Sequence, residues 1–140
     1  MTTNVGKTYE AATFDVSADR IRQYADAVHE ENPIYHDADA AREAGFRDVV
    51  APPMFAVVYS APAMGPPIME TIGEGLPRMV HGGQEFVWGE PVCAGDTITT
   101  EATVKDIQEK DGKTFYVFES VSTNQEGEET VRATWTNIVR

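Results

Sequence analysis

The sequence predicts an α+β fold in which one long central helix is wrapped by a twisted antiparallel β-sheet. In the first 60 residues, apolar side chains recur at helical spacing behind capping residues. In the last 60 residues, apolar and polar side chains alternate, as they do in half-buried strands. A segment at 54–59 is apolar on every side, which is typical of a buried helix. Because 140 residues is the usual length of one hydrophobic core, we predict a single domain over residues 1–140.

The first predicted helix covers residues 17–29. Ser17 is a suitable N-cap, Asp19 places negative charge in the first turn, and the apolar residues that follow have helical spacing: Ile21, Tyr24, Ala25 and Val28. Pro33 disfavours helical backbone at the residue before it. We therefore expect a turn at Asn32 and Pro33.

Two more helices are predicted before the strands. Asp37 caps a short helix that runs to Ala44, and Gly45 is placed to end it. The next helix begins after Pro52 and Pro53, because proline fits a first helical turn, and it includes the apolar segment 54–59. Proline and glycine are frequent at 61–77, which predicts an extended loop with one short helical turn around 68–72.

The strands form a predicted antiparallel meander. Alternating segments rich in valine, threonine and aromatic residues lie at 80–88, 97–107, 113–123 and 130–139, and a further short strand is expected near 7–14. Asp111 and Gly112 form a typical hairpin turn. Because a single sheet over a single helix leaves an edge unpaired, we expect a dimer or other oligomer.

Charge and cysteine content exclude several classes of function. The formal net charge of −12 repels phosphate backbones and anionic lipids, so nucleic acid and membrane surfaces are poor partners. This acidity is typical of salt-adapted proteins and also of many mesophilic ones. The first residues lack a signal-peptide pattern and no segment is long and apolar enough to span a membrane, so we expect a cytoplasmic protein. Cys93 is the single cysteine, which excludes an internal disulfide.

The densest group of polar side chains lies at 29–37. Carboxylates, an asparagine, a tyrosine and two histidines occur there within nine residues, at the end of the first predicted helix and the turn after it. A carboxylate and an imidazole held together could act on a water and on a carbon-bound proton. A solvated helix end is the alternative interpretation. We predict no metal site, because His29 and His36 are separated by a proline turn without other ligands of the usual spacing.

Three segments together resemble a known family. The sequences YADAVHEENPIYHD at 24–37, AGFRDVVAPPMFA at 44–56 and GGQEFVWGEPVCAGDTI at 82–98 resemble the MaoC-like dehydratases. More narrowly, the chain is similar to the N-terminal-domain branch, which includes the non-catalytic subunit of heterodimeric 3-hydroxyacyl-ACP dehydratases. The resemblance implies a hot-dog fold and reversible hydration of an enoyl thioester to an (R)-3-hydroxyacyl thioester. It implies acyl-CoA or acyl-ACP as the substrate, with no resident cofactor.

The chain departs from the catalytic motif that this family uses. The family pattern is Asp, any residue, Asn-Pro-Ile or Asn-Pro-Leu, then His. Asn32 matches, but Glu30 stands at the aspartate position and Tyr35 at the histidine position. A phenol with a pKa near 10 is a poor replacement for imidazole. His36 lies one position later, so the candidate catalytic residues are Glu30, His36 and Tyr35.

Candidate substrate-binding residues lie in the other two segments. The family commonly has His-Gly before the apolar helix, and the glycine N–H can bind the thioester carbonyl. Here the pair is Pro52 and Pro53, which have no N–H, so Met54 would have to replace that donor. The resemblance implies substrate contact with Asn32, Pro53, Met54 and Phe55. Gly82 and Gly83 could let the main chain approach a ligand, or they could form a bend or bulge.

These residues leave three functional hypotheses. The chain is the acyl-binding half of a heteromeric hydratase or dehydratase, with the helix at 54–59 and the loop at 61–77 shaping an acyl tunnel. Alternatively, it is a self-sufficient homodimeric hydratase that uses Glu30 and His36. The third hypothesis is a non-enzymatic module that binds acyl thioesters.

Overall fold

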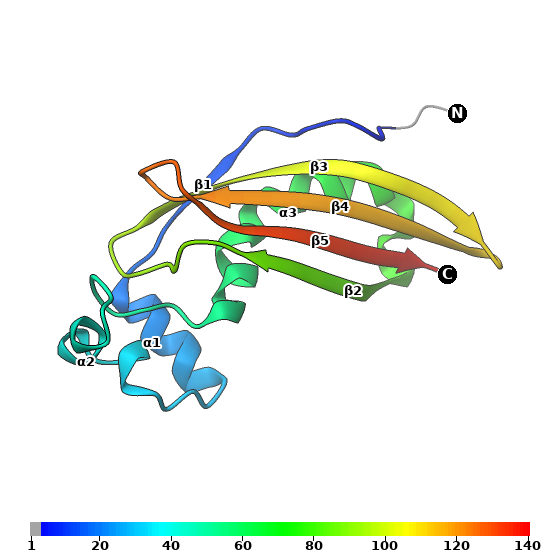
Figure 1. The fold of residues 1–140 in the computed structure, drawn as a ribbon. Helices are drawn as coiled ribbons and strands as arrows, with labels where there is room; N and C mark the ends of the chain where they lie inside the picture. Colours follow the sequence, from blue (N-terminus) through cyan, green and yellow to red (C-terminus); the bar gives the residue numbers. More distant parts are fainter. Residues whose placement is uncertain (1–3) are drawn as a thin grey trace.

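A five-stranded antiparallel sheet and a long helix dominate the fold, as Figure 1 shows in the computed structural model, which describes residues 4–140. The strands have the order β1-β3-β4-β5-β2, and their bounds are β1 (Ala12–Asp15), β2 (Met79–Trp88), β3 (Thr97–Lys110), β4 (Lys113–Thr123) and β5 (Glu129–Val139). The helices are α1 (Ala18–Ala27), α2 (Ala38–Glu43) and α3 (Ala56–Ile72), with short 3-10 helices η1 (Pro33–Tyr35), η2 (Pro53–Phe55) and η3 (Gly73–Arg78). The predicted α+β hot-dog arrangement is confirmed.

Side-chain caps begin the first two α-helices, as predicted. Ser17 Oγ accepts a hydrogen bond from the Arg20 N–H at 3.1 Å, which satisfies one free donor of α1. Asp37 Oδ1 accepts a hydrogen bond from the Asp39 N–H at 3.2 Å at the start of α2. Short polar side chains therefore determine where these helices begin.

The predicted loop at 61–77 is wrong, because α3 continues to Ile72 and η3 follows it. Buried residues recur at helical spacing through the segment, and this stripe packs on the sheet: Ala56, Tyr59, Ser60, Ala63, Met64, Pro67 and Ile72. Pro62 and Pro66 are exposed, so the carbonyls that lose a helical partner there can reach water. Burial of the stripe outweighs the local cost of the prolines.

The four long strands agree with the predicted segments to within a few residues. The short N-terminal strand is displaced along the chain. β1 starts at Ala12, and Thr8 makes only an isolated bridge to Thr103. β1 and β2 are the two edges of the sheet, and β2 is the longer one.

Two groups of buried residues fill the space between the sheet and α3. The first surrounds Phe55, which is 1% exposed and meets the rings of Phe14, Tyr24 and Tyr59 edge to face. The second lies further along α3 and includes Met64, Val104, Phe118 and Trp135.

The small helices lie together at one end of the sheet. Figure 1 places α1 and α2 beside the start of α3, at the opposite end from the C-terminus. The turns that carry the candidate catalytic residues are therefore grouped at this end. Within residues 4–140, no helix meets the length and hydropathy needed to cross a membrane.

Candidate functional site

α1 ends in a tight turn, and the candidate catalytic residues lie in and after this turn along the chain. The His29 N–H donates to the Asp26 carbonyl at 3.2 Å, and the Glu30 N–H donates to the Ala25 carbonyl at 2.8 Å. These two bonds form a Schellman motif, and His29 occupies the left-handed position with φ of +62°. The helix thus ends at Ala27, two residues before the predicted end, because this motif reverses the chain.

Asn32 and His36 hold the following turn through hydrogen bonds. Asn32 Oδ1 accepts a hydrogen bond from the Ile34 N–H at 3.2 Å. His36 Nε2 lies 2.7 Å from the Glu30 main-chain oxygen, and because a carbonyl only accepts, Nε2 carries the proton. His36 Nδ1 lies 3.8 Å from Asp26 Oδ1. The imidazole therefore ties the two ends of the turn together.

Tyr35 is half-buried and lines a pocket beside this turn. Burial raises the pKa of the Tyr35 phenol, and the negative charge of Glu30 raises it further. The hydroxyl is therefore protonated at neutral pH. It can donate a hydrogen bond to a ligand, but it is not a base there.

The pocket has a volume of about 270 Å³ and is largely apolar. Its wall comes from three parts of the chain: Ile34 and Tyr35; Phe46, Val50, Ala51, Pro52, Pro53 and Tyr59; and Trp88, Gly89, Glu90, Pro91, Val92 and Thr130. Trp88 is 48% exposed and stands at the rim, whereas Tyr59 and Thr130 are buried at the floor.

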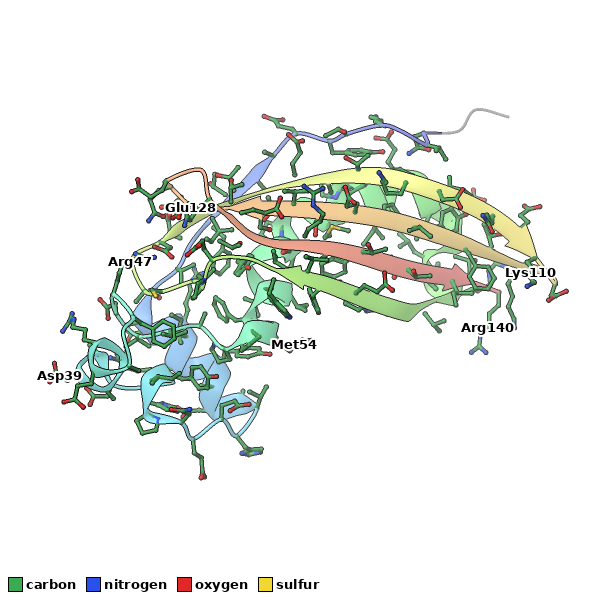
Figure 2. All side chains as sticks on the ribbon, viewed as in Figure 1. Asp39, Arg47, Met54, Lys110, Glu128 and Arg140 are labelled. Carbon is green, nitrogen blue, oxygen red and sulfur yellow. The ribbon has the colours of Figure 1, made fainter. Side chains whose placement is uncertain are left out.

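Of the predicted site residues, the pocket brings together Tyr35 and Pro53. Among the residues that the structure describes, its lining does not include Glu30, Asn32, His36, Met54, Phe55, Gly82 or Gly83. Met54 is 49% exposed and lies in η2, just before α3 (Figure 2). The segment expected as a tunnel loop at 61–77 does not line this pocket either, because it forms the helix that packs on the sheet.

Gly82 and Gly83 form a strand bulge. The pairing of β2 with β5 shifts register between His81 and Gly83. A Cβ atom at Gly82 would overlap the end of the Ile138 side chain, so a larger residue there requires Ile138 to move.

An ion pair that the sequence analysis missed lies beside the pocket, between the buried Asp96 and the exposed Arg47. Arg47 donates from Nη1 and Nη2 to the two carboxylate oxygens of Asp96, at 2.9 and 3.0 Å. Asp96 also accepts hydrogen bonds from the Cys93 N–H at 3.0 Å and from Gln125 Nε2 at 2.9 Å. Burial by itself raises the pKa of Asp96, but these hydrogen bonds outweigh burial and hold the pKa below its ordinary value.

This ion pair joins two walls of the pocket. Arg47 lies two residues before the segment 49–51, and Asp96 lies two residues after the segment 92–94. The two segments are also paired through their main chains, with the Ala51 N–H donating to Val92 O at 2.8 Å. Figure 2 places Arg47 at the same end of the sheet as Glu128. The pair therefore fixes the position of one wall relative to the other.

Comparison with known proteins identifies the family. Residues 3–133 match the family described as FAS1-like, dehydratase domain region. The chain belongs to this family. A UPF0336 protein of Thermobifida fusca is 35% identical to this chain over 138 residues, which cover 97% of this chain and 91% of that protein.

Two solved structures extend the comparison of this FAS1-like dehydratase region. The chain is 27% identical to a chain of the truncated HadBC (3R-hydroxyacyl-ACP dehydratase) complex of Mycobacterium tuberculosis, with a TM-score of 0.85 and 98% coverage of both chains. It is 25% identical to a MaoC-like dehydratase, with a TM-score of 0.86. This match covers 97% of this chain and 42% of the other chain. The resemblance to MaoC-like dehydratases seen in the sequence is confirmed.

The pocket wall of this dehydratase-family chain carries few groups that can move a proton. Its described lining holds the carboxylate of Glu90 and the phenols of Tyr35 and Tyr59, but no imidazole. Of the residues in 4–140, no group of three or more His, Cys, Asp or Glu is placed to hold a metal ion. The arrangement suits binding of an apolar group better than acid and base catalysis.

Proposed function

We propose that this chain is the acyl-binding subunit of an (R)-specific enoyl-thioester hydratase or 3-hydroxyacyl-thioester dehydratase. The catalytic aspartate and histidine then come from a second hot-dog subunit. One observation carries this proposal: the apolar pocket has no imidazole in its described wall. The His36 ring is instead hydrogen-bonded to the Glu30 main-chain carbonyl. In such an assembly this chain positions the acyl thioester while the partner subunit handles the water and the proton at C2.

The start of α3 supports thioester binding beside the pocket. Pro52 and Pro53 have no N–H, so Met54 offers the first main-chain donor of this helical segment. The N-terminal end of a helix carries partial positive charge, which favours an oxygen on which negative charge develops. We propose that an acyl-CoA or acyl-ACP places its thioester there, with no resident cofactor.

The free edge of the sheet supports a second subunit. β2 is an edge strand, and two of its last residues, Val87 and Trp88, are 65% and 48% exposed. Unpaired strand edges with apolar side chains favour association with another sheet. The similar HadBC protein was solved as a complex.

The test is hydration of crotonyl-CoA, which is monitored as a loss of the absorbance of the conjugated thioester. We expect no turnover by the folded chain alone, and turnover once a hot-dog subunit with an intact Asp-x-Asn-Pro-Ile-His motif is added. Turnover by the chain alone that is lost in Glu30→Gln would contradict the proposal and favour the self-sufficient hydratase. Thioester binding without turnover in the presence of every such subunit would favour a non-enzymatic module.

A further inference from the structure

The floor of the apolar pocket is a pair of hydrogen-bonded hydroxyl groups. Tyr59 Oη and Thr130 Oγ1 are 3.2 Å apart, and the two residues are 4% and 3% exposed. Thr130 Oγ1 donates its proton to the Ser122 carbonyl at 3.3 Å, so Tyr59 donates to Thr130. The pair is therefore satisfied without a ligand, and an apolar chain end can rest against it without leaving a donor unpaired.

Packed core lies behind this floor. The Tyr59 ring meets the Phe55 ring edge to face, with centroids 6.2 Å apart. One turn further along α3, Ala63 and Met64 are buried, and Met64 packs with Phe118 and other residues of the second core group. An acyl chain that passed Tyr59 would have to displace these side chains.

We infer that this pocket accepts short acyl chains and that Tyr59 sets the limit. The inference rests on the proposed function, since it concerns the acyl group that the pocket would hold. The volume of about 270 Å³ lies just below the range of roughly 300 to 1,000 Å³ that is usual for drug-sized ligands. A pocket of this size that ends on a rigid pair of hydroxyls excludes long chains by steric overlap.

Binding of saturated acyl-CoAs to the full chain tests this inference without requiring turnover. Trp88 stands at the rim and is half-exposed, whereas Trp135 is buried in the core, so ligand binding should change the Trp88 fluorescence. We expect butyryl-CoA to bind at least about tenfold more tightly than dodecanoyl-CoA, used below its micelle concentration, with octanoyl-CoA between them. Calorimetry provides a second readout that does not depend on tryptophan.

Two variants test whether the pocket floor sets the limit on acyl-chain length. Tyr59→Leu shortens the side chain at the end of the pocket and should lower the preference for butyryl-CoA about tenfold or more. Thr130→Ala, in β5, removes the other hydroxyl group of the pocket floor. This variant provides the same test if Tyr59→Leu does not fold. Tyr24→Leu is the matched control, because its ring also meets Phe55, at 5.5 Å, but it lies outside the described pocket lining and should leave the preference unchanged.

The outcomes separate this inference from the proposed function. Equal binding of all three thioesters by the wild type, or a preference that persists in the folded floor variants, overturns the chain-length limit and leaves the proposed function standing. Failure of the folded wild type to bind any of the thioesters overturns both.

Discussion

His29 takes a backbone conformation that suits glycine better than histidine. Its φ of +62° places it in the left-handed region, where a side chain is strained, and its side chain is exposed. We expect His29→Gly to raise the free energy of unfolding by about 0.5 to 1 kcal/mol, because relief of strain exceeds the added entropy of the unfolded chain. Urea denaturation measures this change.

The neighbouring residue provides the control for this prediction. Val28 has φ of −102°, which any residue adopts, so Val28→Gly should lower stability rather than raise it. If both glycine variants lose stability, the left-handed conformation of His29 carries no strain.

The ion pair of Arg47 and Asp96 shows which site features local sequence patterns do not reveal. The two residues are 49 positions apart, and neither has neighbours that mark it as buried or paired. Only the pairing of segment 49–51 with segment 92–94 brings them together. Tyr35 and Pro53, which line the pocket, lie in recognisable local motifs, whereas Arg47 and Asp96 do not.

Asp96 also makes the free energy of unfolding depend on pH in the acid range. Its pKa is lower in the folded state than in the unfolded chain, where an aspartate has a pKa of about 3.9. Its contribution is therefore present above about pH 3.9 and is lost as the pH falls below that value toward the folded pKa. We expect Asp96→Asn to flatten the fall in urea midpoint below pH 4 and to be less stable than the wild type at pH 7. Equal acid slopes in the two proteins would contradict this assignment.

At the scale of the element, strands could be predicted closely but α3 could not. Segment 113–123 coincides with β4 because alternation and the hairpin at Asp111 and Gly112 act locally. In segment 61–77, proline and glycine indicate a loop, whereas the apolar spacing indicates a helix. Packing against the sheet decides between these two signals, and sheet contacts are not a local property of the sequence.

The prolines of α3 allow a direct test of that competition. Pro66 is exposed and Pro67, beside it, is buried. We expect Pro66→Ala to raise the free energy of unfolding by about 1 to 2 kcal/mol, because it restores a helical N–H. The greater conformational entropy of the unfolded chain without this proline offsets part of that increase. Pro67→Ala restores the same kind of donor but loses buried packing, so its gain should be smaller. A loss of stability in Pro66→Ala by denaturant melting would mean that the proline shapes the helix favourably.

At the scale of the whole molecule, the net charge of −12 opposes folding through repulsion between carboxylates. The described surface ion pairs, such as Lys7 with Glu70 at 2.6 Å, act in the opposite sense. Added salt screens both effects. Since carboxylates outnumber cationic side chains by 23 to 11, we expect the repulsion to dominate.

Stability should therefore rise when low salt is replaced by moderate salt. Between about 10 and 150 mM NaCl the screening length falls from roughly 30 to 8 Å, and we expect the melting temperature to increase by a few degrees. A variant with three exposed glutamates changed to glutamine, at Glu10, Glu31 and Glu43, should start from a higher melting temperature and respond less to salt, because it carries less repulsion to screen. A melting temperature that falls with salt in both proteins would instead show that the surface ion pairs outweigh the repulsion. The range below 150 mM is chosen because screening acts there before salt alters hydrophobic burial appreciably.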